Sequence, residues 1–166
     1  AALRTAGGRY LTHIYLIALG SNIRHPMCGS PQDVVRTAFA ALREIGSVER
    51  ISRVIGSAPV GPSRRRYANA AAILQTDCAP EPMLANLKNI ERQFGTRRGG
   101  RWQARVLDLD IVLWSGGMWA SPGLSIPHPQ FRRRDFVLRP ASAIAPDWRD
   151  PVTALSLKHL NARLTK

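Results

Sequence analysis

Apolar and polar residues follow one another along this chain with periods that predict strands and helices in turn. A short apolar run at 14–19, rich in β-favouring residues, predicts a buried strand over 13–20. Apolar residues at helical spacing then predict a helix over 31–45, with Ser30 and Pro31 as its N-cap and first residue. Looser alternation predicts one strand over 48–57 and another over 67–75.

The second half of the chain continues the same pattern. Apolar residues on one face predict a helix over 80–94, and the strongest strand pattern of the chain covers 106–114. Gly116-Gly117 is typical of a hairpin, an apolar segment follows at 136–138, and a terminal helix is expected over about 153–164. Residues 1–12 show no period and are interpreted as a flexible N-terminal lead-in.

The order strand, helix, strand, strand, helix, strand is that of the ferredoxin-like split βαβ plan. It predicts an α+β fold in which helices flank an antiparallel sheet, giving three layers. A length of 166 residues suits one domain, which we expect over 13–166.

The charge of the chain indicates an anionic partner. Lys and Arg number 24 against 11 Asp and Glu, which gives a net charge of +13. Arginines cluster at 64–66, 97–105 and 132–134, and their planar forks suit phosphate oxygens. At this level nucleic acid and nucleotide phosphate both fit.

Other function classes are disfavoured. No apolar run approaches the length of a membrane span, and no leader pattern precedes the first strand. Cys28 and Cys78 lie far apart without a Cys-x-x-Cys pair, so reduced thiols and a cytoplasmic location are predicted. The four histidines form no ligand set for zinc with each other or with the cysteines.

The sharpest chemical feature is a pair of aspartates in the last strong strand. Side chains alternate along a strand, so Asp108 and Asp110 share one face, at about 7 Å between their Cα atoms, while the leucines and Ile111 between and around them fill the other. Two carboxylates at this distance repel each other unless a cation compensates them. Magnesium is the ion that such oxygen ligands and substrate phosphates hold together. Solvent exposure of both carboxylates on a half-covered sheet is the structural alternative.

The loop before these aspartates carries Arg97, Arg98, Arg101 and Arg105, which could neutralise a polyphosphate. No P-loop motif and no Gly-x-Gly-x-x-Gly run occurs in the chain. If ATP binds, it therefore binds outside the P-loop, Rossmann and protein-kinase schemes.

Several motifs together resemble the 6-hydroxymethyl-7,8-dihydropterin pyrophosphokinase family, over nearly the whole stretch 15–146. The most specific piece is Arg101-Trp102 followed by Arg105-Val-Leu-Asp-Leu-Asp-Ile111. The other pieces are Ala18-Leu-Gly-Ser-Asn22, Ser57-Ala-Pro-Val-Gly-Pro62, Tyr67-Ala-Asn-Ala-Ala71, Ile90-Glu91, Ile126-Pro-His128 and Arg134-Asp-Phe136.

The resemblance implies a ferredoxin-like fold and transfer of pyrophosphate from ATP to the hydroxymethyl group of the pterin, with release of AMP, in folate biosynthesis. It implies two Mg²⁺ ions on Asp108 and Asp110, and catalytic roles for Arg97, Trp102 and Arg105. The implied pterin-binding residues are Ser57, Ala58, Val60, Tyr67, Asn69 and Phe136. The implied ATP-binding residues are Glu91, Arg98, Ile111, Ser125, His128 and Arg134. ATP and the pterin are the expected partners, with a monomer and neither membrane nor nucleic acid.

Two alternatives stay open. The chain departs from the family pattern at Thr96, Gln103-Ala104 and Gly123, which favours a family member that binds pterin or nucleotide without efficient turnover. The positive charge favours an RNA-binding ferredoxin-like domain, although no RRM signature is present on the central strand.

Overall fold

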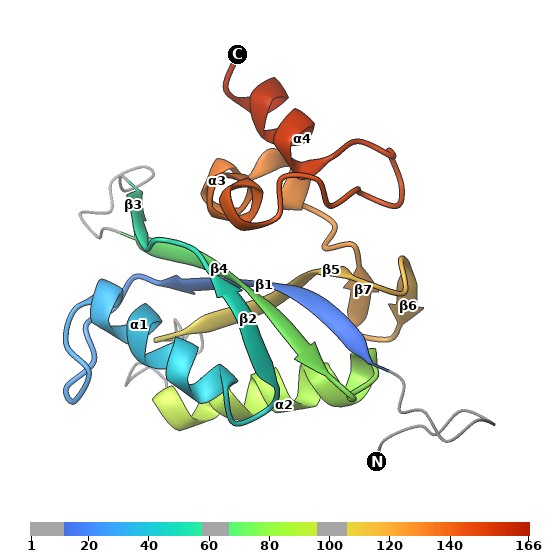
Figure 1. Ribbon diagram of the computed structural model, residues 1–166. Helices are drawn as coiled ribbons and strands as arrows, with labels where there is room; N and C mark the ends of the chain where they lie inside the picture. The colour runs from blue at the N-terminus through green and yellow to red at the C-terminus, as the bar shows by residue number, and fades with distance from the viewer. Residues whose placement is uncertain (1–11, 58–66, 96–105) are drawn as a thin grey trace.

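The computed structural model of the protein describes residues 12–57, 67–95 and 106–166. Its strands are β1 (His13–Ser21), β2 (Ser47–Ile51), β3 (Ile55–Ser57), β4 (Tyr67–Thr76), β5 (Asp108–Trp114), β6 (Trp119–Ser121) and β7 (Leu124–Ile126). Its helices are α1 (Pro31–Leu42), α2 (Pro80–Phe94), α3 (Asp135–Ile144) and α4 (Leu157–Leu164), with a short 3-10 helix, η1 (Phe131–Arg133). Figure 1 shows three layers, with α1 and α2 below a twisted sheet and α3 and α4 above it.

The main sheet of the described residues is antiparallel and follows the order β2-β4-β1-β5, while β3 pairs with a further part of β4. The central strand β1 pairs with β4 along its whole length and with β5 from Tyr15 to Gly20. The first and last long strands are thus neighbours, with β1 inside the sheet and β5 at its edge. This arrangement confirms the predicted ferredoxin-like α+β fold with an antiparallel sheet between helices.

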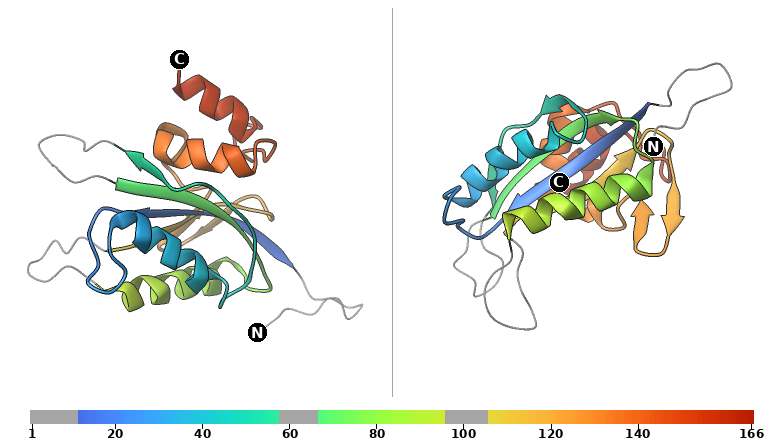
Figure 2. Two further views of the ribbon diagram at one scale, coloured as in Figure 1. Left: turned by 60° about the vertical axis from the view of Figure 1, so that its left-hand side comes forward. Right: turned by 90° about the horizontal axis from the view of Figure 1, so that it is seen from below.

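The two faces of the sheet bury separate cores. Because side chains alternate along β1, Ile17 and Leu19 enter the core formed with α1 and α2, whereas Leu16 and Ala18 face α3. Seen from below, α1 and α2 lie side by side across the first face (Figure 2). The second face is covered by α3 only in part, since Asp108 on that face is exposed. The open part of the second face is where a ligand can reach the sheet.

Local sequence explains how the two long helices begin and end. The Ser30 hydroxyl accepts from the N–H of Asp33, whose carboxylate accepts in return from the N–H of Ser30, so α1 starts with a capping box. Pro80 occupies the first turn of α2, and Gly95 ends that helix with a φ of 87°. The predicted bounds of 80–94 for α2 are confirmed.

The predicted strand over 48–57 is wrong in one respect, because the structure divides it into β2 and β3. Between them the N–H of Ser52 donates to the carbonyl of Ala71, and the Ser52 hydroxyl accepts from the N–H of Ala71. A side chain therefore replaces part of the strand ladder at this point. The alternation in the sequence does not reveal such a break, since apolar residues continue through it.

Two predicted helices are longer than the observed ones. The helix expected over 31–45 ends at Leu42, and the next three residues form tighter i to i+3 bonds, such as that from Ile45 N–H to Leu42 carbonyl. The terminal helix expected from 153 begins at Leu157, where Ser156 is the N-cap. The apolar segment 136–138 lies within the first turns of α3.

A bulge in β5 changes which core its last residues enter. The register against β1 shifts between Leu16 and Ile17, so Val112 and Leu113 both pack in the core below α3. The expectation that Leu113 shares a face with Ile111 is therefore wrong. Beyond β5, Gly117 has a φ of 92° in the turn that leads to β6, but the hairpin joins β6 to β7 rather than β5 to β6.

Two further expectations concern the N-terminal lead-in and membrane-spanning segments. The lead-in at 1–12 falls almost wholly outside the described residues. Within the part of the chain that the structure describes, no helix has the length and apolar character needed to cross a bilayer.

Candidate active site

Asp108 and Asp110 lie on the face of β5 that α3 leaves partly open. The register places Asp108 beside Gly20 and Asp110 beside Ala18 of β1, and paired residues in an antiparallel sheet point to the same side. The Asp110 side chain is 45% exposed, and Asp108 is exposed as well. The prediction that both carboxylates lie on one face of the strand is confirmed, and their role as metal ligands stays a prediction.

Asn69 belongs to the same face, one strand further. Gly20 pairs with Asn69 on β4 and with Asp108 on β5, so these three residues form one row across the sheet. A Cβ atom at position 20 would lie 3.2 Å from Oδ1 of Asn69. Because Gly20 has no side chain, it leaves room for the Asn69 amide, which is itself buried.

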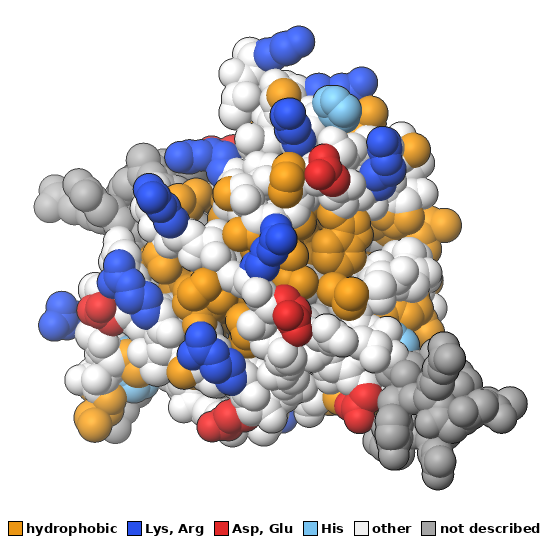
Figure 3. All heavy atoms as spheres, viewed as in Figure 1, with side chains coloured by type: hydrophobic (Ala, Val, Ile, Leu, Met, Phe, Trp, Pro, Cys, Tyr) orange, Lys and Arg blue, Asp and Glu red, His pale blue; other side chains and the backbone are white. Residues whose placement is uncertain are grey.

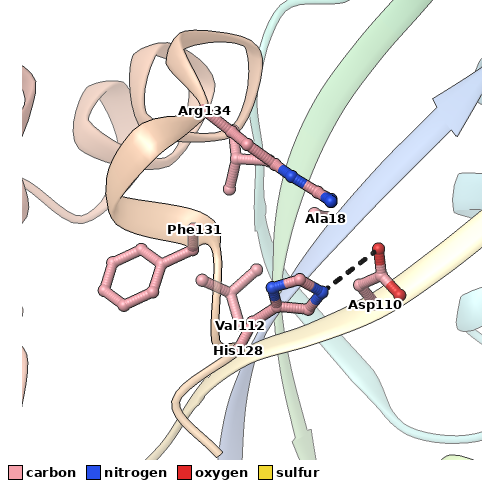
Figure 4. Close-up of a pocket in the computed structure, with 7 residues that line it drawn as sticks. Ala18, Asp110, Val112, His128, Phe131 and Arg134 are labelled. Carbon is pink, nitrogen blue, oxygen red and sulfur yellow. Dashed lines mark ion pairs between the residues drawn. The ribbon is translucent and has the colours of Figure 1, made fainter. Parts of the chain in front are cut away.

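A second segment brings two cationic or titratable groups to Asp110. His128 and Arg134 flank η1, and with Asp110 and Ala18 they line a small open pocket whose floor includes Val112. In Figure 4 the His128 ring faces Asp110, and the Arg134 side chain extends over Ala18 toward the same carboxylate. His128 Nε2 lies 4.0 Å from Asp110 Oδ2. Three of the predicted site residues thus meet at one point.

The position and protonation of His128 follow from its surroundings. Its main-chain N–H donates to the carbonyl of Val112 at 3.0 Å, which fixes the residue against β5. Burial lowers the pKa of His128, and the positive charge of Arg134 lowers it further, whereas Asp110 acts in the opposite direction. The net lowering favours the neutral imidazole near neutral pH, so the ring acts as a hydrogen-bonding group rather than as a cation.

The pterin-site candidates among the described residues come from three elements. Tyr67 is the first residue of β4, is 36% exposed and pairs with Ser57 of β3. Phe136 lies in the first turn of α3 and is half-buried against the core between α3 and the sheet. The Arg134 guanidinium lies 5.8 Å from the centre of its ring. Tyr67 and Asn69 are two residues apart on β4 and so share a face, and Phe136 packs in the core on that same face with Ala71. Their stacking on a ligand stays a prediction.

Glu91 takes a position that the sequence pattern did not suggest. It is 4% exposed, and its Oε1 accepts from the N–H of Leu109 at 2.9 Å, between the two aspartates. Lys88 lies 3.5 Å from the other carboxylate oxygen. The side chain therefore ties α2 to β5 directly behind the aspartate pair, and its predicted contact with ATP stays untested.

This geometry predicts a structural cost for Glu91→Ala. Losing the acceptor leaves the buried N–H of Leu109 without its partner, which destabilises the protein by about 1–3 kcal/mol. Chemical denaturation should show this loss, whereas Glu81→Ala, at an exposed position in the same helix, should change the unfolding free energy by less than about 0.5 kcal/mol. Equal stability of the two variants would contradict a supporting role for Glu91.

The remaining ATP-site candidates divide by exposure. The side chain of Ile111 is 3% exposed and packs in the core on the opposite face from the aspartates, so only its main chain is available to a nucleotide. Ser125 is exposed in the middle of β7, two residues before Pro127. Six candidates from the pterin, ATP and catalytic sets lie outside the described residues: Ala58, Val60, Arg97, Arg98, Trp102 and Arg105.

One departure from the family pattern has a local cause. Gly123 follows Pro122 in the two-residue turn between Ser121 and Leu124, and its φ is 81°. Proline followed by a residue of positive φ is the pattern of a type II turn, in which glycine is the favoured second residue. An arginine at this position would have to adopt a conformation that costs about 1–2 kcal/mol.

The oxygen donors at this site fit magnesium. Among the described residues, no three His, Cys, Asp or Glu side chains lie close enough together to hold a metal ion by themselves. The donor set consists of two carboxylates on one strand, and Mg²⁺ typically takes one or two carboxylates together with water and substrate phosphates. Ala18 and Gly20 of the neighbouring strand β1 add little or no side chain beside the two aspartates. They were not predicted as site residues, although small residues at alternate positions of the 18–22 motif are a usable signal.

Solved structures with the same fold include the crystal structure of Plasmodium falciparum HPPK-DHPS wild type with pteroate. The TM-score is 0.69 at 14% identity, and the alignment covers 92% of this chain. The chain spans only 42% of the length of that structure's chain. At this level of identity the likeness concerns the fold.

Sequence comparison gives a closer relation. A family model described as 7,8-dihydro-6-hydroxymethylpterin-pyrophosphokinase matches residues 16–146. The 2-amino-4-hydroxy-6-hydroxymethyldihydropteridine pyrophosphokinase of Synechocystis sp. is 37% identical over 141 residues, covering 84% of this chain and 70% of that protein. The protein of the same name from Pseudomonas aeruginosa is 36% identical over 138 residues, covering 81% and 82%. A match of this extent, which includes the aspartate pair and its neighbours, shows that this chain belongs to the 7,8-dihydro-6-hydroxymethylpterin-pyrophosphokinase family.

Proposed function

We propose that this protein transfers the β,γ-diphosphate of ATP to the hydroxymethyl oxygen of 6-hydroxymethyl-7,8-dihydropterin, releasing AMP, as a step of folate biosynthesis. The observation that carries the proposal is the row Asn69, Gly20 and Asp108, with Asp110 next along β5. It sets an amide suited to a pterin edge beside carboxylates suited to phosphate-bound magnesium, on one face of the sheet. The names of the relatives above support the same activity.

The reaction balances without a further reactant. The hydroxymethyl oxygen of the pterin attacks the β-phosphorus of ATP, and its proton is released to water. The bond from that phosphorus to the oxygen shared with the α-phosphate breaks, and AMP leaves. Phosphoryl transfer of this kind depends mainly on positioning and on stabilising charge, since little covalent chemistry falls to the protein.

The protein's own residues have distinct tasks in this proposal. Asp108 and Asp110 would hold two magnesium ions, whose chemistry there is to offset negative charge on the phosphates. Arg134 and a neutral His128 would contact the nucleotide beside Asp110. Glu91, Arg98, Ile111 and Ser125 are the further ATP candidates, and Arg97, Trp102 and Arg105 would act at the transferring group.

The pterin would be held by shape and by hydrogen bonds. Tyr67 and Phe136 would supply aromatic rings that stack on the pterin, and Asn69 offers a donor and an acceptor on one amide. Main-chain groups of Ser57, Ala58 and Val60 would complete the edge of the ring. The monomeric state and the cytoplasmic location remain predictions.

The function is tested by following AMP release with 6-hydroxymethyl-7,8-dihydropterin, ATP and Mg²⁺. We expect AMP and pterin diphosphate in equal amounts, and no AMP when 6-methyl-7,8-dihydropterin, which lacks the attacking oxygen, replaces the substrate. Binding of both ligands without AMP release would identify the non-catalytic family member. Absence of both binding and turnover would refute the proposal as a whole.

An RNA-binding function finds less support. On the face shown in Figure 3, the described Lys and Arg side chains are separated by apolar and uncharged atoms rather than joined in one basic track. The open face of the sheet carries Asp108 and Asp110, which repel nucleic-acid phosphates in the absence of bound cations. Filter binding with a single-stranded RNA at physiological salt should detect only weak, salt-sensitive association.

A further inference from the structure

Asp150 is the most completely buried charged residue of the described chain, and it lies beyond the residues that the family model matches. Its side chain is 0% exposed. Oδ2 accepts from Arg132 Nε at 2.5 Å and from the Thr153 hydroxyl at 2.7 Å, while Oδ1 accepts from Arg132 Nη2 at 2.7 Å and from Val152 N–H at 3.0 Å. The carboxylate thus has hydrogen bonds to both oxygens, two of them from one guanidinium.

These bonds keep Asp150 charged. Burial by itself raises the pKa of Asp150, but the hydrogen bonds from Arg132, Thr153 and Val152 outweigh it and lower the pKa to about 2. Because folding lowers this pKa, the stabilisation is present above the ordinary value of 3.8 and is lost as the pH falls through about 2. The ion pair is therefore fully formed at neutral pH.

The partner of Asp150 lies within the segment that approaches the candidate ATP site. Arg132 is the middle residue of η1, two residues before Arg134 and four after His128, and both of these line the pocket at Asp110. At its other end the segment is held by the bond from His128 N–H to Val112. The segment 128–134 is thus fastened to β5 at one end and to Asp150 near the other.

The loop that carries Asp150 is itself firmly held. The main-chain N–H of Asp150 donates to the carbonyl of Leu155 at 2.9 Å, and the carbonyl of Asp150 accepts from the N–H of Ala154 at 2.8 Å. The N–H of Leu157 donates to the carbonyl of Trp148 at 2.9 Å. Leu157 and Leu160 of α4 pack in the same core as Phe131, which is 1% exposed. A fixed loop can impose an orientation on the arginine that it binds.

From these contacts we propose that Asp150 is a positioning residue for ATP: through its bidentate bond to Arg132 it sets the orientation of the segment that presents His128 and Arg134. Removing the charge at position 150 releases Arg132, which is 27% exposed and can turn to solvent. The segment 128–134 stays anchored by the buried Phe131 and by α3, but it loses the ion pair that orients η1, and Arg134 is then less well placed for a nucleotide. The pterin candidates Ser57, Tyr67 and Asn69 lie on β3 and β4, outside the segment that this ion pair holds, and Phe136 is part of α3. We therefore expect the effect to fall on ATP more than on the pterin.

Asp150→Asn is the direct test, and it rests on the function proposed above. We expect the KM for ATP and the dissociation constant of a non-hydrolysable ATP analogue to rise about tenfold, as charged bidentate hydrogen bonds are the strong ones. The KM for the pterin should stay within about twofold, whereas general loosening of the structure would alter both substrates together. Asp147→Asn changes an exposed aspartate three residues before Asp150, and as the matched control it should change neither value.

Two further variants keep the proposal testable if Asp150→Asn does not fold. Arg132→Lys retains the charge but loses the planar fork, and it should weaken binding of the ATP analogue several-fold. Thr153→Val removes one hydrogen bond and no charge, and we expect about a twofold rise in the same constant. Folded variants with unchanged affinity for the analogue, or equal losses for ATP and pterin, would overturn the inference. Wild-type protein that binds the analogue but releases no AMP would instead refute the proposed function alone.

Discussion

Replacing Asp110 by asparagine is expected to reduce the rate of AMP release at least about a hundredfold, since the loss of one charge-compensating group typically costs this much in phosphoryl transfer. Asp108→Asn should have an effect of the same order. Each change removes a carboxylate from the open face of β5, while Leu109 and Ile111 on the covered face stay in the core. The unfolding free energy should therefore remain close to that of the wild type.

The measurement is AMP release at saturating ATP and pterin across a range of Mg²⁺ concentrations. The dependence on Mg²⁺ should shift to higher concentrations in both variants, which a loss of folded protein would not produce. Asp77→Asn is a suitable control because Asp77 follows the other end of β4 and is exposed. Near-normal turnover of Asp108→Asn and Asp110→Asn at low Mg²⁺ would refute the metal-site interpretation.

Gly20→Val is expected to have an effect of similar size through geometry instead of charge. A Cβ atom at this position would stand 3.2 Å from Asn69 Oδ1, closer than ordinary contacts, and the two branches of valine would project into the space between Asn69 and Asp108. A displacement of about 1 Å at such a site can cost a hundredfold in rate. Pterin affinity and turnover should both fall, while binding of the ATP analogue should change less.

The control for Gly20→Val is Gly56→Ala, which adds a side chain to another strand residue of the same sheet. There a Cβ atom would meet only the carbonyl of Tyr67 at 3.9 Å, an ordinary contact. Gly20→Ala should be intermediate, because the Asn69 amide has to move by only a few tenths of an ångström. Unaltered pterin affinity in Gly20→Val would show that the row across β4, β1 and β5 does not hold the pterin.

The sequence predicts the chemistry of the site where that chemistry depends on residues close to one another along the chain. Strand alternation alone put Asp108 and Asp110 on one face, and the structure agrees. The approach of His128 and Arg134 to Asp110 was expected only from the family resemblance. These residues lie 18 or more positions after Asp110, and residue periods say nothing about contacts over that distance. The structural role of Glu91 was not foreseen, since a carboxylate on a helix gives no sign of the strand N–H that it will meet.

The sequence by itself determined the alternation of strands and helices from β1 to β5 apart from the division of β2 and β3, the N-cap of α1 at Ser30, the start of α2 at Pro80, and the shared face of the two aspartates. These features follow from residue periods and from neighbours within a few positions, which act before any tertiary contact forms. Only the tertiary structure decided the break at Ser52, the bulge that turns Leu113 to the core between α3 and the sheet, and the pairing of Arg132 with Asp150. Each of these depends on register or on contact between distant segments, where the gain from packing and from satisfying buried polar groups outweighs local preference.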